Sequence, residues 1–384
     1  MLINSELREQ SARFERWMLE QALPLWAAKG VDTVSGGCFE TMLATGEADK
    51  DVDRRTRVQG RQMFVFAAAA EQGWLTQGRE LVEGIQDYLD RYAGHPALPG
   101  AYVFKLNSQH QPVDSKLDTY DCAFFLLAWA YQYKVFADPK ASARATALMA
   151  LLDNQFAADS GGYLEGDYSS PIRRQNPHMH LFEAFLAWYE ASGEKVWLKR
   201  AANILVLFKR HFFEAEKGVL YEYFDAALNK AQSAEGEVVE PGHLMEWVWL
   251  LREYERFSGE PLDGYCNALY ATGLRLGMDN ECGLLFDEIN ATGQVLKVSK
   301  RLWTVTELIK AHLAQAKAGN LQAEQAAAEA IEALFRCHLG TQIPGWYIER
   351  LDNENRPVEQ PAPATSMYHL MMACLETVKY CKKK

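Results

Sequence analysis

Apolar residues recur at intervals of three and four along most of the chain. The pattern is clear in the segments SARFERWMLEQALPLWA, QMFVFAAAAEQGW, CAFFLLAWAYQYKVF, LFEAFLAWYEASG, LMEWVWLLREYERFSG and RLWTVTELIKAHLAQA. This spacing is typical of α-helices that bury one or more faces. Alanine and leucine, which favour helices, dominate these segments, and proline lies mostly outside them. We therefore expect a largely α-helical chain.

Six short segments led by glycine divide these helices at nearly constant spacing. They are GGCFE at residue 36, GAYVF at 100, GGYLE at 161, GVLYE at 218, GLLFDE at 283 and GWYIE at 345. Most of them end in an acidic residue. The intervals are 57 to 65 residues, and six units of 64 fill the 384 residues of the chain. Repetition at a fixed period indicates a repeat architecture, in which each unit holds two helices joined by a turn or short hairpin.

Twelve helices in six hairpins predict an all-α (α/α)6 barrel, with six inner helices ringed by six outer ones. An open helical solenoid is the alternative. A solenoid needs polar capping repeats at its ends, whereas the first and last units here look like the middle ones. No low-complexity linker divides the chain, so we expect residues 1–384 to form one domain.

Composition narrows the classes of partner and compartment. The formal net charge of -11 disfavours nucleic acid and anionic membrane as the main partner. No apolar run approaches the ~20 residues that cross a bilayer, and the N-terminus lacks the pattern of a signal peptide. The seven cysteines have no CxxC spacing, which fits reduced thiols better than a disulfide framework. We expect a cytoplasmic protein that is a monomer or homodimer.

Polar and aromatic residues occur at matching positions in the six units. Counting 19 to 25 residues forward from each glycine leads to the start of a helix and to Arg57, Tyr120, His180, His243, Trp303 and His369. In a closed barrel these helix starts meet at one mouth. Helix starts are often simply polar, which would account for a single histidine. Three histidines, an arginine and a tryptophan at equivalent positions of different units indicate a functional site.

Two of these histidines precede a glutamate by one helical turn. Asn176, His180 and Glu183 have the i,i+4 and i,i+3 spacing that places them on one face of a helix, and His243 and Glu246 repeat the His-x-x-Glu spacing. A carboxylate one turn from an imidazole can accept its N–H and fix its tautomer. Glu183 and Glu246 are therefore expected to serve the histidines.

His178 stands about 200° around the same helix from His180, so the two cannot share one ligand. A metal-binding pair on a helix needs i,i+4 spacing, and we predict no metal. His178 is expected to be structural. The same expectation, surface or packing, applies to His95, His110, His211, His312 and His338.

The predicted site suits proton transfer. Histidines with a pKa near neutrality are good general acids and bases, and two facing imidazoles could remove and return a proton on carbon. An arginine could stabilise the developing enolate oxygen, and Tyr120 and Trp303 offer flat faces to a sugar ring. The chain has no P-loop, no GxGxxG and no nucleophile elbow. We predict proton transfer next to a carbonyl with no cofactor.

The motifs RTRVQGRQMFVFA, NPHMHLFEAFLAWYE, EPGHLMEWVWLLREY and KRLWTVTELIKA resemble the N-acylglucosamine 2-epimerase superfamily, and the resemblance runs over nearly the whole chain. It implies an (α/α)6 barrel and either aldose epimerisation or aldose–ketose isomerisation. By matching motif, it places the family's catalytic residues at His180, His243, His369 and Arg57, with Asn176 and Glu246 at supporting positions.

Similarity to the mannose isomerase branch implies a specific reaction: interconversion of an aldose and its ketose, of the D-mannose and D-fructose type, through a cis-enediolate. In this hypothesis His243 and His369 are the acid–base pair, Arg57 holds the oxyanion, and His180 with Asn176 contacts a sugar hydroxyl. The sequence leaves open which of His243 and His369 reaches C2. The remaining predicted substrate contacts are Glu246, Tyr120, Trp303 and Glu183.

Three other functions are open at this point. An aldose 2-epimerase would share the enediolate. A glycosidase would need two carboxylates roughly 5 to 9.5 Å apart across the cavity, drawn from Asp118, Asp121, Glu183, Glu246 and Glu307. A non-catalytic sugar-binding protein could use the aromatic residues but would not need the matched histidines.

Overall fold

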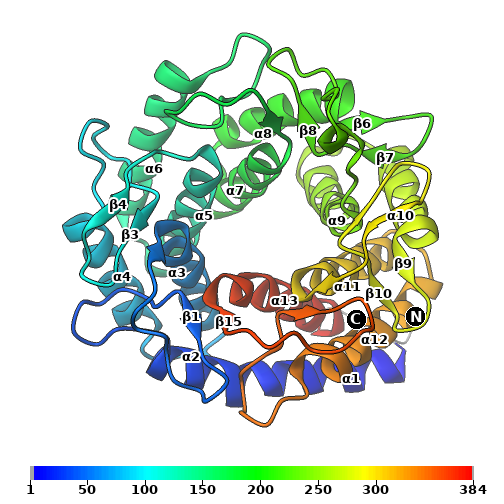
Figure 1. Ribbon diagram of the computed structural model, residues 1–384, viewed down its shortest axis with the longest axis horizontal. Coiled ribbons are helices and arrows are strands. Elements are labelled where there is room, and N and C mark those ends of the chain that lie inside the picture. The colour runs from blue at the N-terminus through cyan, green and yellow to red at the C-terminus, as the bar shows by residue number, and fades with distance from the viewer. Residues whose placement is uncertain (1–3, 383–384) are drawn as a thin grey trace.

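The computed structural model describes residues 4–382, which form a closed ring of helices in two layers (Figure 1). Inner and outer helices alternate along the chain. The inner layer consists of α3 (Thr56–Glu71), α5 (Thr119–Phe136), α7 (Asn176–Ser192), α9 (Pro241–Ser258), α11 (Leu302–Lys317) and α13 (Met367–Lys382). The outer layer consists of α1 (Ser5–Trp17), α2 (Leu23–Lys29), α4 (Gly78–Tyr92), α6 (Pro139–Leu151), α8 (Lys195–Leu207), α10 (Asp263–Gly277) and α12 (Gln322–Leu334). The predicted (α/α)6 barrel is confirmed.

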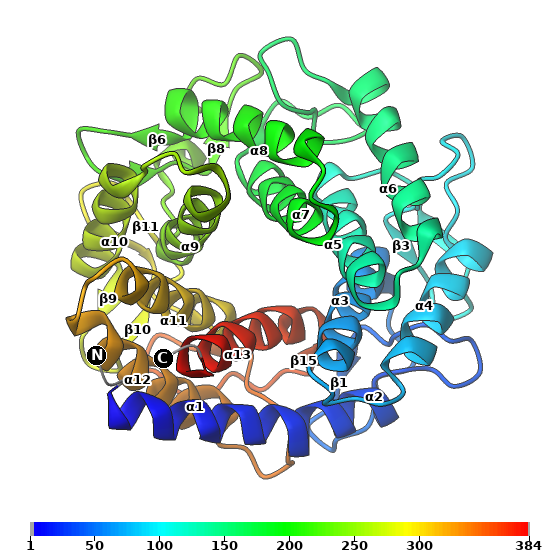
Figure 2. The ribbon, with the colours of Figure 1, turned by 180° about the vertical axis from the view of Figure 1, so that it is seen from behind.

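The ring closes between the first and last units. Helix α13 packs against α11 on one side and α3 on the other, and α1 packs against α12 and α13. Strand β1 (Thr41–Met42) pairs antiparallel with β15 (Ala362–Pro363). Segments from the two ends of the chain therefore lie side by side, as both views of the ring show (Figures 1 and 2). The architecture is a closed barrel and not an open solenoid.

Between the α-helices lie short strands and short turns of π-helix or 3-10 helix. The strands are β2 (Arg54–Arg55), β3 (Lys105–Leu106), β4 (Pro112–Asp114), β5 (Arg173–Arg174), β6 (Phe213–Glu214), β7 (Val219–Leu220), β8 (Tyr223–Phe224), β9 (Met278–Asp279), β10 (Leu284–Leu285), β11 (Glu288–Ile289), β12 (Val295–Lys297), β13 (Lys300–Arg301) and β14 (Arg350–Leu351). The turns are η1 (Met18–Ala22), η2 (Leu152–Phe156), η3 (Phe208–Phe212), η4 (Ala234–Glu237), η5 (Phe335–Leu339) and η6 (Ala364–Ser366).

The six repeat glycines share one backbone conformation. Each has a positive φ, between 64° and 95°, at Gly36, Gly100, Gly161, Gly218, Gly283 and Gly345. A residue with a Cβ is strained in this region, so glycine is favoured there. Several of these glycines reverse the chain in a small hairpin that follows an outer helix, such as β6–β7 and β9–β10. The repeat seen in the sequence is thus a repeated turn.

The two layers differ in burial. The outer helix α4 buries a stripe that includes Val82, Ile85 and Leu89, whereas every residue of α11 from Leu302 to Ala316 is buried. Because an inner helix has no face in water, its polar residues need partners within the ring. Within residues 4–382, no helix combines the length and the apolar character that would let it cross a bilayer.

Candidate active site

A cavity of about 200 Å³ opens at the end of the barrel where the inner helices begin. Its lining is strongly polar and comprises Arg55, Arg57, Arg61, Tyr120, Asn176, His180, Glu240, His243, Glu246, Arg301, Trp303, Glu349, Thr365, Ser366 and His369. Eight of the nine residues predicted for the site are in this list, and the ninth, Glu183, lies directly behind His180. The equivalent helix starts therefore do meet at one mouth.

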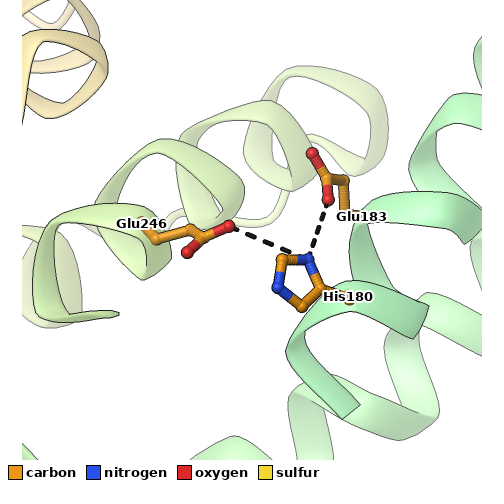
Figure 3. A group of neighbouring side chains, drawn as sticks. All are labelled: His180, Glu183 and Glu246. Carbon is orange, nitrogen blue, oxygen red and sulfur yellow. Dashed lines mark hydrogen bonds and ion pairs between the residues drawn. The ribbon is translucent and has the colours of Figure 1, made fainter. Parts of the chain in front are cut away.

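His180 is oriented by the glutamate that follows it on α7. Its Nδ1 donates to Glu183 Oε2 at 3.1 Å, as the His-x-x-Glu spacing predicts. Tyr368 donates its hydroxyl to the same oxygen. Figure 3 shows His180 between Glu183 and Glu246, whose Oε1 lies 3.8 Å from Nδ1. Burial lowers the pKa of His180 to about 4, despite Glu183, so its imidazole is neutral.

His243 has a different carboxylate partner from the one that the sequence predicts. Its Nδ1 lies 3.0 Å from Glu222 Oε1, in the hairpin before α9, and not beside Glu246. Gln175 fixes Glu222 by donating to Oε2 at 3.0 Å. The side-chain amide of Asn176 lies 3.4 Å from Nε2 of His243. Asn176, expected beside His180, thus faces His243.

His369 pairs with a glutamate on the neighbouring inner helix. Its Nδ1 donates to Glu307 Oε1 at 2.9 Å, and the other oxygen of Glu307 lies 2.6 Å from Lys310 Nζ. An ionised carboxylate only accepts hydrogen bonds, so beside the anionic form of Glu307 the proton of the imidazole lies on Nδ1. The Nε2 atom of His369 then carries no proton and has a free lone pair.

The histidines of the presumed acid–base pair have opposite electrostatic surroundings. Burial lowers the pKa of His243, but Glu222 and Glu240 outweigh burial and raise it to about 9. Burial also lowers the pKa of His369, and the nearby cations Arg61 and Lys310 hold it further below its usual range. Around neutral pH His243 is therefore an imidazolium and His369 a neutral base.

An aromatic wall separates these two histidines. The ring of Trp303 lies 4.9 Å from that of His243 and 5.7 Å from that of His369, measured between centroids. A flat, nearly buried indole between an acid and a base suits one face of a sugar. Tyr120, a second aromatic residue of the cavity lining, accepts a hydrogen bond from Arg61 through its hydroxyl at 2.6 Å, which fixes its ring.

Arg57 and Arg61 are both in the cavity, but only one is neutralised. Arg57 Nη1 lies 3.2 Å from Asp121 Oδ1. Arg61 is 4% exposed and donates to the carbonyl and hydroxyl oxygens of Thr365 and to Tyr120. Within residues 4–382 it has no carboxylate in salt-bridge contact. A cation without a counter-ion is the stronger attractor for a developing oxyanion.

Arginines that directly precede three of the inner helices form a repeated pair with a carboxylate. In the first, third and fifth units, the acidic residue four positions after the repeat glycine accepts the backbone N–H and the Nε–H of the arginine before the inner helix. These pairs are Glu40 with Arg55, Glu165 with Arg174 and Asp287 with Arg301. The fourth unit places Glu222 at this position, where it orients His243.

Four functional residues were not assigned to the histidine site from the sequence: Glu222, Arg61, Glu307 and Lys310. A signal existed for Glu222, because it is the acidic residue that ends GVLYE. Glu307 was expected only as a glycosidase candidate. Its pairing with His369 joins two helices, α11 and α13, so no spacing within one helix could reveal it.

Glu246 lies at the edge of the cavity without a hydrogen-bond partner for either oxygen among residues 4–382. Burial and the nearby Glu307 raise its pKa well above the usual range, with Lys310 opposing them. These surroundings favour the protonated form of Glu246, whose O–H can donate to a ligand.

The remaining histidines have structural partners. His178 accepts a hydrogen bond from the backbone N–H of Tyr163 at 3.0 Å and donates to the carbonyl of Arg174 at 3.1 Å, which confirms its structural role. His312 meets the hydroxyl of Tyr270 at 2.6 Å, and His338 donates to the carbonyl of Ile348 at 2.8 Å. None of these three histidines lines the cavity.

Among residues 4–382, three groups of possible ligands lie close enough to share one cation, and all of their members are buried except the half-buried Glu240: His180, Glu183 and Glu246; Glu222, Glu240 and His243; and Glu246, Glu307 and His369. In each group the imidazole already meets a carboxylate through Nδ1. Lys310 lies in contact with the third group. That the protein works without metal stays a prediction.

The chain matches a known protein family over most of its length. The model for N-acylglucosamine 2-epimerase (GlcNAc 2-epimerase) matches residues 37–373. The chain belongs to the N-acylglucosamine 2-epimerase family. It is 34% identical over 391 residues to a mannose-6-phosphate isomerase of Rhizobium meliloti (strain 1021), and the match covers 99% of each chain.

Two more distant proteins are also similar to this chain. A cellobiose 2-epimerase of Bacteroides fragilis is 21% identical over 306 residues, which cover 73% of this chain and 76% of that one. The crystal structure of a D-mannose isomerase superposes with a TM-score of 0.85 at 21% identity, covering 97% of each chain. The structural match supports the fold and carries no assignment of substrate.

Proposed function

We propose that this protein is a cofactor-independent aldose–ketose isomerase that interconverts an unphosphorylated hexose of the D-mannose type and its 2-ketose. Membership of the family gives the coarser assignment, a sugar isomerase or epimerase. The observation that carries the proton-transfer chemistry is the opposite protonation of His243 and His369 on the two sides of Trp303. Similarity to a relative named an isomerase favours the aldose–ketose reaction over epimerisation.

The protonation states suggest the role of each histidine. The imidazolium of His243 donates a proton to the ring oxygen and takes up the proton that the O1 hydroxyl releases, which opens the sugar to its aldehyde. The bare Nε2 of His369 then removes the proton from C2, which leaves a cis-enediolate. His243 donates its proton to O1 and accepts the hydroxyl proton from O2, while His369 returns the proton to C1, which gives the ketose and restores both histidines.

Arg61 is the group that we propose for the enediolate oxygen. Its guanidinium is held by Tyr120 and Thr365, so its direction is fixed before the sugar binds. It has the free charge that Arg57 lacks. A donor that is prearranged at the developing charge is worth roughly 10²- to 10³-fold in kcat. Arg57, which pairs with the buried Asp121 and lies over the ring of Tyr120, then serves to hold these two side chains in place.

A sugar phosphate is the competing substrate class, because the relative from Rhizobium meliloti is named a mannose-6-phosphate isomerase. A phosphate carries nearly two negative charges and needs unpaired cations. Of the four arginines that line the cavity, three are matched by carboxylates, in the pairs Glu40 with Arg55, Asp121 with Arg57 and Asp287 with Arg301, and the fourth, Arg61, is the group proposed for the enediolate oxygen. This balance favours a neutral sugar.

The volume of the cavity indicates how long a sugar it can hold. Its volume of about 200 Å³ is below the roughly 300–1,000 Å³ of drug-sized ligand pockets. One hexose suits it better than a disaccharide. The glycosidase alternative needs two free carboxylates, whereas Glu183 and Glu307 are bonded to histidines and Asp121 to Arg57.

The test is to incubate the purified protein separately with mannose, mannose 6-phosphate, cellobiose and N-acetylglucosamine and to identify the products by NMR. We expect fructose from mannose at the highest kcat/KM. Glucose as the main product would make the protein a 2-epimerase. Preferred turnover of the phosphate or the disaccharide would overturn the substrate class, and binding of mannose without turnover would indicate a non-catalytic protein.

A further inference from the structure

Lys310 is a cation enclosed in the wall of the barrel below the cavity. Lys310 and Glu307 are both 0% exposed, and Nζ of Lys310 lies 2.6 Å from Oε2 of Glu307. The ammonium group also lies 4.0 Å from the centre of the Trp249 ring. Removing an ammonium from water is costly unless carboxylates compensate, so a lysine here needs a reason.

Lys310, Glu307 and His369 form a chain of contacts that ends at the cavity. Glu307 uses one oxygen for Lys310 and the other for Nδ1 of His369, at 2.6 Å and 2.9 Å. Lys310 and Glu307 lie one turn apart on α11, whereas His369 comes from α13. Lys310 itself does not line the cavity, so it can affect a ligand only through this chain.

The charge of Glu307 decides which nitrogen of His369 carries the proton. As an anion, Glu307 accepts Nδ1–H and leaves Nε2 free to take a proton from carbon. As a neutral acid, Glu307 could donate its own O–H to Nδ1, and the imidazole proton would then lie on Nε2. Burial raises the pKa of Glu307 and so favours the neutral form, and Lys310 is the strongest opposing influence.

We propose that Lys310 is a positioning residue for the reaction: it holds Glu307 as an anion and thereby keeps His369 in the tautomer that can remove a proton from C2 of the sugar. The role of His369 in this statement rests on the proposed function. The tautomer itself does not, because it is a property of the protein without sugar.

Other charged and titratable groups surround this chain. They lie on α3, α7, α9 and α13 and comprise Arg61, His180, Glu183, His243, Glu246 and Tyr368. Glu183 and Glu246, together with Glu307, raise the pKa of Lys310 against the effect of burial, so it stays an ammonium. Arg61 acts on His369 in the same direction as Lys310.

The experiment compares the full-length protein with Lys310→Met, which keeps the length of the side chain and removes its charge. We expect kcat for mannose at pH 7 to fall about 10-fold or more, since general base catalysis is worth roughly 10²- to 10⁴-fold. KM should change less than about 2-fold. The acid limb of the kcat profile should move to higher pH, because Glu307 now ionises at a higher pH.

A spectroscopic measurement reads the tautomer directly. In protein labelled with 15N-histidine, the signals of His369, assigned by their loss in His369→Asn, should show a protonated Nδ1 and a bare Nε2 in the wild type. In Lys310→Met the proton should shift toward Nε2. This result decides the inference even if no sugar is turned over, in which case only the proposed function fails.

Lys317→Met is the matched control. Lys317 is on the same helix and pairs with Glu376 at 2.8 Å, but its side chain is 34% exposed and far along the helix from Glu307. We expect wild-type kcat, pH profile and His369 signals. If Lys310→Met does not fold, Lys310→Gln, which can donate to Glu307 without a charge, replaces it with the same expectations. An unchanged acid limb and an unchanged tautomer in the folded variant would overturn the proposal.

Discussion

Nδ1 of His243 lies 3.0 Å from Oε1 of Glu222, a residue four positions after the repeat glycine Gly218. The histidine begins an inner helix and the glutamate belongs to the hairpin before it. Glu222 is 2% exposed, so little water screens the pair. This contact, with Glu240, makes His243 the cationic member of the histidine pair.

Glu222→Gln tests the acidic role of His243. The pKa of His243 is raised to about 9, so its imidazolium is present below that pH and is lost as the pH rises through it. Without the carboxylate the pKa falls, and the alkaline limb of the kcat/KM profile should move to lower pH. At pH 8 the rate should drop by about 10-fold or more. Glu216→Gln, at an exposed site in the same connection, should keep the wild-type profile, and an unmoved alkaline limb in Glu222→Gln would refute the assignment.

Arg61→Lys and Arg57→Lys separate the two arginines of the cavity. Lysine keeps the charge but loses the planar fork that meets Tyr120 and Thr365. We expect Arg61→Lys to lower kcat by roughly 10²-fold, as for one lost oxyanion donor. Arg57→Lys should have a smaller effect on kcat, since Asp121 neutralises Arg57. If steady-state kinetics show the larger loss of kcat in Arg57→Lys, the residue that stabilises the oxyanion is Arg57 and not Arg61.

Gly345→Ala and Gly283→Ala test the repeated turn. Both glycines have positive φ, 84° and 74°, so alanine should cost about 1–2 kcal/mol of unfolding free energy at each. A Cβ at Gly345 would lie 2.3 Å from the carbonyl oxygen of Gln21, whereas a Cβ at Gly283 meets nothing within 4 Å. Gly345→Ala should therefore cost about 1–3 kcal/mol more. Urea denaturation measures the difference, and equal losses would contradict the packing described.

Chelation tests the predicted independence from metal. The Nδ1 atoms of His180, His243 and His369 are bonded to carboxylates, and the proposed steps use only protons. Dialysis against EDTA should leave kcat unchanged, and added Mg²⁺, Mn²⁺ or Zn²⁺ should not raise it. Full loss of turnover that a divalent ion restores would show that one of the buried donor groups holds a metal.

The barrel was predictable because its signals are periodic. Helices follow from apolar spacing, and the six glycines adopt the left-handed conformation that selects glycine. Counting along the chain from those turns predicted that Arg57, His180 and His369 lie at the same end of the barrel. The pairing of His180 with Glu183 was equally readable, since both lie one turn apart on the same helix.

Contacts between different helices and strands could not be predicted from the spacing of residues along the chain. The His-x-x-Glu pattern assigned Glu246 to His243, yet Glu246 lies near His180, and the carboxylate beside His243 is Glu222. Whether an arginine is neutralised depends on a neighbouring helix, as Asp121 on α5 does for Arg57. The pKa values that distinguish acid from base depend on all these contacts together, so the sequence could name the histidines but not divide their roles.

The central claim is that His369 removes the C2 proton, and exchange in D2O tests it most directly. The wild-type protein, incubated with mannose in D2O, should yield fructose that carries deuterium at C1, and recovered mannose should gain deuterium at C2. In His369→Asn, which keeps a polar side chain on α13, both signals in the NMR spectrum should fall by roughly 10²-fold or more, while mannose still binds and circular dichroism is unchanged. Exchange at the wild-type rate in a folded His369→Asn variant would contradict the claim.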